Sequence, residues 1–579
     1  MKIERLLLGL FASFLMVGCS QNDDSPNAGE EQVNGKNKDS YMAVNIVSSN
    51  TASRAATEGD FEYGKGIENK VNNAHFFFFN SDGSPYELQA ETADYTVDGS
   101  TATVSGEAAH NWLYFSSFVE GTQESGTPAG SVEKVLNAVL IFKGKSSTVP
   151  AKVVAVLNLD HTLLSNSISL KEVPTMLEVA EEKAFSTENN GNFVMSNSVY
   201  AKGTNNETIV NATDISDKAK NSVEAALNDA VNIYVERLAV KVTVNNSISG
   251  TTTSTNVEAG GKTVYAKILG WDLNTTINKS HLLKDITNAA NTWGSSTATW
   301  NASQYYRSYW ASSVPSSGSY KTSFSWHGLK NTLGSSDYCL ENVSTSDQTK
   351  IVVSAQLVDD QGNALTLAQW MGTYYVVETE TNSGITTKKW EEGLLTAVAN
   401  SLNLYKEVSS SYVKIAPSDI QIVPKYTTAS GTTSTNSHDF YKVDFAFKSS
   451  GTWYKGTGTG NNITVDDQNP ITATEGGLIT GVVPAKVWQD GATYYFTNIE
   501  HFNGKDAVIR NHHYVVNITG AVGLGTPVYY PDGYKPEDST PDIPEIPDPV
   551  VPSDDETYLS AKINVLSWKI VNNDVTLGQ

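Results

Sequence analysis

The chain has 579 residues, with 63 Asp and Glu against 40 Lys and Arg, and its formal net charge at pH 7 is −23. A surface this acidic repels the phosphate backbone of nucleic acids, so we expect no nucleic-acid partner. The length exceeds what a single hydrophobic core supports, and it predicts two or three domains.

The first residues have the pattern of an export signal. Lys2 and Arg5 precede an apolar run over 6–17, and Gly18-Cys19 follows. The run is shorter than the roughly 20 residues that span a bilayer, so it predicts a cleaved leader over 1–18. A cysteine directly after the cleavage position predicts a lipoprotein with a diacylglycerol group on Cys19. The alternative is an ordinary secretory signal followed by a coincidental cysteine.

Only one other cysteine, Cys339, is present. If Cys19 carries lipid, no disulfide can form within the chain, and Cys339 is expected to be a small buried hydrophobe. The stability of the exported chain must then come from burial and hydrogen bonding.

Short apolar runs alternate with clusters of Ser, Thr, Asn and Gly along the chain, which is typical of β-sandwich proteins. Turn signals over 80–83 and 359–362 predict two hairpins. We therefore expect a mainly β fold of two tandem β-sandwich domains with a few short helices. Strands are expected at 75–79, 138–142, 152–157, 234–244, 262–269, 350–358, 374–378, 441–447, 494–497 and 507–518.

Helical periodicity is confined to three segments, 170–185, 216–231 and 390–405. The stretch 246–261, rich in Ser, Thr and Gly, is the best internal boundary. The N-terminal sandwich domain is therefore expected over 55–247, and the C-terminal one over 248–526.

The C-terminal end carries an isolated strand on a tether. Eight of the 18 prolines lie from Pro527 to Pro552, so 527–556 is expected to be an acidic, semi-rigid spacer of polyproline II. Residues 557–579 behind it are too few to fold alone. Their strand must pair with a sheet edge in its own domain or in another subunit, and the tether favours the second arrangement. Its apolar positions alternate and then shift phase, which indicates a bulge or a second short strand; they are Leu559, Ala561, Ile563, Val565, Leu566, Trp568 and Ile570.

Another alternating strand lies over 40–48, with Met42, Val44 and Ile46 on one face. The loop after it contains Arg54, one of only five arginines in the chain, followed by Ala55. An arginine-specific protease would find an accessible bond there. The alternative is that Arg54 is simply a solvated loop charge.

The order of several motifs resembles that of the Bacteroidia fimbrillins, the type V pilins, and most closely their minor-fimbrium (short-fimbria) branch. The polar residues 20–24 also resemble a surface-export tag of Bacteroidia lipoproteins. A polar tail over 572–579 and a shorter, more acidic tether depart from the pattern. Besides the two ends, the matching motifs are VVAVLN at 153–158, FVMSN at 193–197, VERLAVKV at 235–242, YCLEN at 338–342, VIRNHHY at 508–514 and LSWK at 566–569.

The resemblance implies transthyretin-like or Greek-key sandwich domains and assembly by strand exchange. A precursor anchored in outer-membrane lipid through Cys19 would be cut by an arginine-specific protease between Arg54 and Ala55. The propeptide 19–54 would leave with its strand, and the terminal strand of a neighbouring subunit, residues 557–579, would fill the opened groove, which we expect in the N-terminal domain. Head-to-tail insertion gives a filament, here a cell-surface fimbrium. The implied partners are other copies of the chain, related anchor and tip subunits, and host or bacterial surface ligands.

No pattern predicts catalysis, a cofactor or a metal site. His512 and His513 are adjacent, so in a strand they point to opposite faces and cannot share one metal ion. The glycine-rich segment 456–460 lacks the lysine of a phosphate loop and predicts a hairpin.

Two other functions remain open from the sequence: a tip or accessory adhesin of the same fimbrium, and a surface glycan-binding lipoprotein that keeps its N-terminus. Tryptophans in the second half could stack on sugars, although such residues are more often part of a core. They are Trp271, Trp293, Trp300, Trp310 and Trp326.

Overall fold

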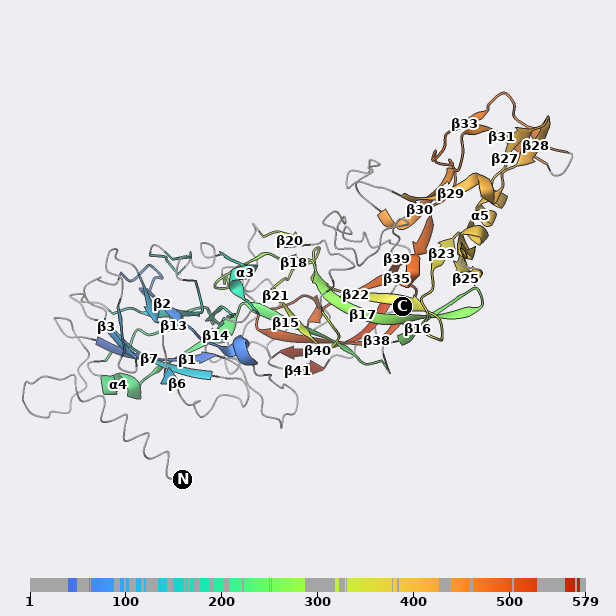
Figure 1. Ribbon diagram of the computed structural model, residues 1–579. Coiled ribbons are helices and arrows are strands. Elements are labelled where there is room, and N and C mark those ends of the chain that lie inside the picture. Colours follow the sequence, from blue (N-terminus) through green and yellow to red (C-terminus); the bar gives the residue numbers. More distant parts are fainter. Residues whose placement is uncertain are drawn as a thin grey trace, which may run out of the picture.

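The chain is elongated, with three regions of sheet that follow one another along the molecule (Figure 1). This computed structural model describes residues 40–48, most of 62–527, and residues 558–567 and 570–572. The longest internal gaps are 121–133, 287–317 and 426–438. The leader, Cys19, Arg54, Ala55, the tether beyond residue 527 and Trp568 lie outside the described residues. Among the helices that are described, none has the length and apolar character needed to cross a bilayer.

The N-terminal region is built on a nine-stranded sheet that is covered on both faces. Phe76 and Phe78 of one strand pack into the core on one face, and Phe77 and Phe79 pack into the core on the other. The apolar run is uninterrupted because a strand between two cores has no polar side. In sheet order the strands are β5 (Trp112–Phe115), β2 (Ala74–Phe79), β8 (Lys152–Leu157), β10 (Met195–Asn197), β14 (Val231–Arg237), β1 (Ser40–Ser48), β7 (Lys134–Phe142) and β6 (Val119–Glu120), with β13 (Thr213–Asp214) beside β8.

The middle region is a sandwich of two five-stranded sheets around one core. Cys339 lies in this core with a free, fully buried thiol, as expected, and burial raises its pKa. The first sheet contains β21 (Ser336–Leu340), β15 (Ala239–Asn246), β38 (His512–Val522), β40 (Tyr558–Ser567) and β41 (Ile570–Asn572). The second contains β16 (Thr252–Ala259), β17 (Lys262–Asn274), β22 (Lys350–Val358), β35 (Ala492–Asn498) and β39 (Thr526–Pro527).

The third region is an insertion between β22 and β35, which are neighbours in the sandwich. Its core is separate and includes Leu394 and Val398 of helix α5 (Lys389–Ser401). Residues 248–526, expected as one sandwich domain, thus contain two cores. One sheet holds β24 (Thr373–Val376), β23 (Leu367–Trp370), β34 (Ala485–Trp488), β30 (Asp439–Phe447) and β29 (Ile420–Lys425); the other holds β28 (Ser411–Lys414), β27 (Leu404–Val408), β31 (Gly451–Thr457), β32 (Thr464–Val465) and β33 (Ile471–Ala473).

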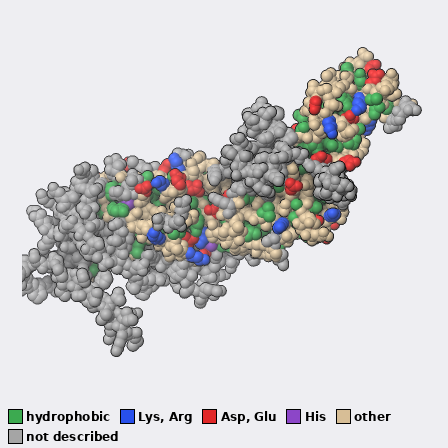
Figure 2. All heavy atoms as spheres, viewed as in Figure 1, with side chains coloured by type: hydrophobic (Ala, Val, Ile, Leu, Met, Phe, Trp, Pro, Cys, Tyr) green, Lys and Arg blue, Asp and Glu red, His purple; other side chains and the backbone are tan. Residues whose placement is uncertain are grey.

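Exposed large hydrophobic side chains concentrate in the third region, which carries hydrophobic side chains on the face shown in Figure 2. They include Met371, which is 72% exposed, and also Val408, Val413, Leu478 and Val483. The charged side chains of this face have both signs.

The remaining described elements are short. The small strand pairs are β3 (Asp94–Val97) with β4 (Ser100–Thr103), β11 (Tyr200–Lys202) with β12 (Thr208–Val210), β18 (Thr276–Ile277) with β20 (Tyr320–Lys321), β19 (Lys279–His281) with β9 (Glu178–Ala180), β25 (Thr379–Asn382) with β26 (Ile385–Lys388), and β36 (Glu500–His501) with β37 (Lys505–Asp506). The helical turns are α3 (Glu181–Ala184), α4 (Val223–Asn228), η1 (Gly66–Asn69), η6 (Pro417–Asp419) and η7 (Gln489–Gly491).

The mainly β architecture is confirmed, and two of the expected elements are wrong. The strand expected over 234–244 is two strands in different sheets, because the Leu238 N–H donates to the Val194 carbonyl instead of continuing a ladder. Among its described residues, the helix expected over 170–185 contains the strand β9, and the helical part is the turn α3. Pairing of β9 with β19 overrides the helical spacing there.

Gly491 lies where the chain returns from the third region to the sandwich. A substitution there tests how closely the backbone of the insertion approaches the sandwich. Its φ is +74°, and a Cβ there would lie 2.3 Å from the Leu357 carbonyl oxygen. Gly491→Ala should lower the free energy of unfolding by about 2 kcal/mol or more, because strain and the clash add. Gly372→Ala is the control, since its φ is +80° but its Cβ would meet open space. Urea unfolding that gives equal losses for both variants would contradict the close approach.

Candidate functional site

Strand β1 occupies the interior of the N-terminal sheet. It pairs antiparallel with β7 from Ser40↔Phe142 to Ser48↔Lys134, and parallel with β14 from Val44↔Val231 to Ser48↔Val235. In the sheet order, β1 alone connects β7 and β6 to the other described strands. Removing it would leave a channel with unpaired backbone groups along both walls.

The apolar positions of β1 stand in register with a core. Met42 is 1% exposed and belongs to the core on one face of the N-terminal sheet. Val44 and Ile46 follow at two-residue intervals, so they occupy positions on the same face of the strand. Their cross-strand partners are buried members of that core: Ala138 and Val231 opposite Val44, and Leu136 and Ile233 opposite Ile46.

The terminal strand β40 pairs antiparallel with β38 of its own sandwich, from His512↔Ser567 to Val522↔Tyr558. This is one of the two arrangements that the sequence leaves open. The predicted second short strand is present as β41, in which Ile570 pairs with Leu566.

The register of β40 places its alternating positions beside core residues of β38. A bulge in β38 between Ile518 and Gly520 keeps the phase along the pair. Four core residues of β38 stand opposite the alternating positions: Ala521 opposite Leu559, Ile518 opposite Ala561, Val516 opposite Ile563 and Tyr514 opposite Val565.

The N-terminal region meets the sandwich at Leu238, between β14 and β15. The sequence places this boundary later, between 247 and 248. The Arg237 N–H donates to Asn511 Oδ1 at 3.3 Å, and the Asn511 N–H donates to the Ala239 carbonyl at 2.8 Å. The start of β38 therefore holds both sides of the crossing.

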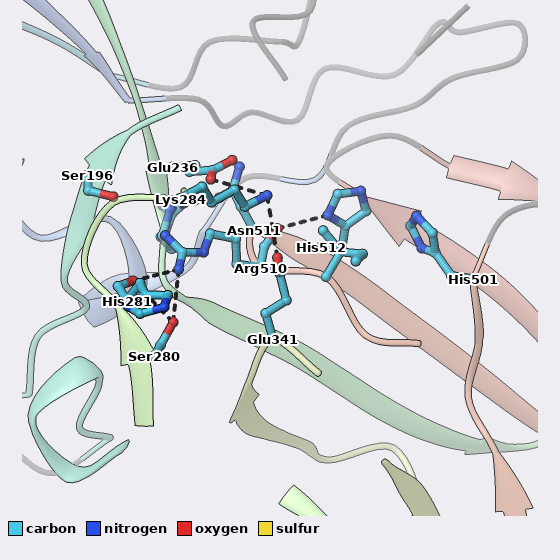
Figure 3. A network of polar contacts seen from close by, with 12 residues as sticks. Ser196, Glu236, Ser280, His281, Lys284, Glu341, His501, Arg510, Asn511 and His512 are labelled. Carbon is cyan, nitrogen blue, oxygen red and sulfur yellow. Dashed lines mark hydrogen bonds and ion pairs between the residues drawn. The ribbon is translucent and has the colours of Figure 1, made fainter. Parts of the chain in front are cut away.

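A buried network of charges lies on one side of this crossing (Figure 3). Lys284 Nζ is 3.6 Å from Glu236 and 3.4 Å from Glu341, and all three side chains are at most 5% exposed. The fully buried Arg510 donates its backbone N–H to the Glu341 carboxylate at 3.0 Å. Its guanidinium donates to Ser280 Oγ at 2.8 Å and to the carbonyls of His281 at 2.7 Å and Leu282 at 3.3 Å. The network thus contains two cations, Lys284 and Arg510, and two anions, Glu236 and Glu341. Buried charges are stable only when they are paired in this way.

A second cluster, the Glu62–Glu68 cluster, lies at the same junction and consists of Glu62, Glu68, Lys241, Tyr338 and His513. Lys241 Nζ is 2.8 Å from Glu68 and 3.5 Å from Glu62. The Tyr338 hydroxyl donates to Glu68, and His513 Nδ1 donates to Glu62.

Burial opposes the ionisation of Glu62, but other groups outweigh it. The hydrogen bond from His513 and the charges of His513, Lys241 and Lys65 lower the pKa of Glu62 to about 2. Burial likewise opposes ionisation of Glu68, and Lys241 and the hydrogen-bond donors lower its pKa. Both carboxylates are therefore charged at neutral pH.

The aromatic and histidine candidates occupy structural positions where they are described. Trp271 is fully buried, and its Nε1–H donates to the Thr332 carbonyl at 3.0 Å. The other four tryptophans lie outside the described residues. His512 Nδ1 contacts the Arg510 carbonyl, whereas His513 contacts Glu62, so the two rings have different partners. Within the residues that the structure describes, no three His, Cys, Asp or Glu side chains gather as metal ligands would.

The junction charges were missed by the reasoning from sequence. A signal was present, because Glu236, Arg237 and Lys241 interrupt an apolar run over 231–244. Charges within a buried strand indicate paired partners elsewhere. The partners themselves are distant along the chain, so the sequence alone does not identify them.

No model of a known protein family and no curated protein matches the chain. Among solved structures, a candidate cell adhesion protein of Parabacteroides distasonis is similar at 13% identity and a TM-score of 0.34, over 91% of this chain and 96% of that one. A candidate cell adhesion protein of Bacteroides eggerthii is 11% identical, with a TM-score of 0.31, over 93% and 98%. The tip fimbrial protein Mfa3 of Porphyromonas gingivalis, truncated at its C-terminus, is 10% identical, with a TM-score of 0.25, over 75% and 99%. At these scores the similarities establish neither a family nor a function.

The folded chain should lose stability in mild acid through His501. This ring is fully buried, with Nδ1 2.8 Å from the Tyr514 hydroxyl, and burial followed by the charge of Lys284 lowers its pKa from 6.5 to about 3. Since the unfolded chain takes up this proton below pH 6.5 and the folded chain does not, its contribution to stability is complete above pH 6.5 and declines toward pH 3. The loss approaches about 1.4 kcal/mol per pH unit.

Urea unfolding of His501→Gln between pH 7 and pH 4 measures this contribution. The variant should show a shallower decline than the parent chain, with the remainder due to other groups such as His513. An identical slope in the two proteins would contradict the assignment to His501.

Proposed function

We propose that this chain is a structural subunit of a surface fimbria that assembles by exchange of β-strands between subunits. The observation that carries the proposal is β1, a strand held inside the N-terminal sheet and followed in the sequence by Arg54. The precursor travels as a lipoprotein anchored through Cys19 in the outer membrane. The assembled fimbria supports adhesion and biofilm formation.

Cleavage after Arg54 would free β1 from the chain that follows it. The emptied channel would expose the edges of β7 and β14 and apolar side chains of these two strands, including Leu136 and Ile233. Such a surface is costly in water, and an incoming strand removes that cost by β-strand addition. Burial of five apolar side chains of a neighbour's terminal strand would contribute roughly 8–12 kcal/mol before ordering costs.

The distribution of arginine narrows the accessible cleavage sites of the exported chain to two, of which Arg54 is the one that follows β1. Arg237 is 2% exposed and Arg510 is fully buried, and both donate hydrogen bonds at the domain junction. A folded chain therefore hides these two residues from an arginine-specific protease. Arg5 lies in the leader, which leaves Arg54 and Arg307 outside the described part of the chain.

The terminal strand pairs within its own chain and is attached to the sandwich by a long tether. β40 pairs with β38 in the single chain, with its apolar positions in phase with the sandwich core. The tether over 527–556 would span up to about 90 Å as polyproline II, at about 3.1 Å per residue. We propose that β40 leaves β38 and fills the channel that β1 vacates in the next subunit.

Protein sheared from the cell surface tests the proposal directly. N-terminal sequencing should begin at Ala55, and an unboiled sample should run on a gel as a ladder that collapses to one band on boiling. A lipidated start at Cys19 with one monomer band in both lanes would overturn the proposal and favour a surface-binding lipoprotein.

Two complementary variants separate the donation of the terminal strand from the acceptance of a neighbour's strand. Arg54→Ala keeps β1 in place, so this subunit should donate its terminal strand but not accept one. Ile563→Asp puts a charge opposite the core position Val516, so this subunit, once cut, should accept a strand but not donate. Neither variant alone should polymerise, and their mixture should give a heterodimer and nothing longer.

Each variant has a matched control. Lys562→Asp changes the neighbouring position, which stands opposite Asn517 on the other face of β40, and Arg307→Ala removes another arginine. Both controls should form full ladders. A mixture of Arg54→Ala and Ile563→Asp that stays monomeric by light scattering would mean that β40 remains on its own sandwich.

A further inference from the structure

Residues 62–69 come shortly after the proposed cut, and only residues 56–61 separate Ala55 from Glu62. The segment lies before β2 in the sequence, so it belongs to the N-terminal region by chain order. Its two carboxylates, Glu62 and Glu68, however, contact the middle sandwich.

Three neighbouring strands of one sheet receive this segment. Lys241 lies on β15, Tyr338 on β21 and His513 on β38, and the sheet order is β21-β15-β38. Glu68 contacts Lys241 and Tyr338, while Glu62 contacts Lys241 and His513. Two carboxylates thus span the width of three strands.

Glu68 of this segment, and Lys70 and Asn72 just after it, are fixed to the N-terminal region by hydrogen bonds from their backbone groups to side chains. Asn158 accepts the Asn72 N–H at 2.8 Å and donates to the Lys70 carbonyl at 2.7 Å. The Glu68 carbonyl accepts from Arg237 Nε at 2.6 Å, at the end of β14. Residues 62–72 are therefore attached to both regions at the point where the chain crosses between them.

Burial strengthens the contacts between the carboxylates and Lys241. The side chains of Glu68 and Lys241 are 6% and 9% exposed, so salt and water screen this pair far less than a surface pair. Removing one partner leaves the other charged and buried, which is strongly unfavourable. His513 also contacts the Thr243 hydroxyl through Nε2 at 2.7 Å, and Thr243 contacts Ser336 at 2.6 Å, so the cluster continues across the sheet.

We propose that residues 62–69 form an interdomain latch that holds the N-terminal sheet and the middle sandwich in one fixed orientation, and that the latch remains after the propeptide is removed. The second part rests on the proposed cleavage after Arg54. The latch makes the rigidity of the subunit independent of which strand occupies the channel of β1.

Paired spin labels at Leu163→Cys and Leu269→Cys measure the orientation. These positions are 42% and 47% exposed and lie on different sides of the junction, and the buried thiol of Cys339 does not react. Pulsed electron resonance on the full chain, with Cys19→Ser, should give a narrow distance distribution. The double variant Glu62→Gln/Glu68→Gln should widen it about twofold, since unlatched domains move by default.

The matched control is Glu178→Gln, which removes a partly buried 3.4 Å pair with Lys279 between β9 and β19. It should leave the distribution as in the parent chain. If the double variant fails to fold by circular dichroism, Lys241→Met removes the central cation and tests the same contacts. A narrow distribution in a folded latch variant would overturn the proposal.

Measurement before and after cleavage after Arg54 tests the second part. The latch predicts the same narrow distribution in both forms. If removal of residues 1–54 alone widens the distribution, then β1 fixes the orientation and the latch is wrong. A chain that resists cleavage or does not polymerise would contradict the proposed function, while the measurement on the full chain still decides the latch.

Discussion

The crossing from β14 to β15 at Leu238 is the constraint on which the arrangement of the molecule depends. Glu236 pairs with Lys284 in one buried network, and the next residue, Arg237, donates to the backbone carbonyl of Glu68 in the Glu62–Glu68 cluster. Adjacent residues of an extended strand point to opposite sides, so one short sequence serves both networks. Buried charges tolerate little displacement from their partners, and the two regions are therefore held at a defined angle.

The two strands assigned to exchange differ in how fully they are paired. β1 lies between two longer strands, β14 and β7, whereas β40 has one long neighbour, β38, and one of three residues, β41. In both strands the alternating apolar positions stand opposite buried core residues. A strand with period two fits any channel that offers one apolar wall and two free edges, so the same pattern suits a resting place in the chain and a place in another copy.

Sequence patterns correctly predicted the strands, turns and buried positions that depend on residues close together in the chain. The strands at 152–157 and 350–358, the turns at 80–83 and 359–362, and the burial of Cys339 follow from alternation, turn chemistry and composition. What depends on distant partners was missed: His513 contacts Glu62 across 451 positions of sequence, and β9 forms a strand because β19 lies beside it. The third region was also missed, since its core begins and ends inside a continuous series of strand patterns. The residues assigned to lipidation and cleavage lie outside the described structure, so their roles remain proposals.

The third region leaves the sandwich after β22 and returns before β35, which are paired side by side. A short turn could join these two strands as a plain hairpin, although Leu367 and Trp488 of the insertion also pack in the sandwich core. The rest of the region has its own core, so its outer part can change in length or surface without disturbing the junction or the strand channel. In a polymer it would recur once per subunit, and its exposed apolar residues would form a regularly spaced array. Weak contacts made by each copy would then act together, because attachment of one raises the effective concentration of the next.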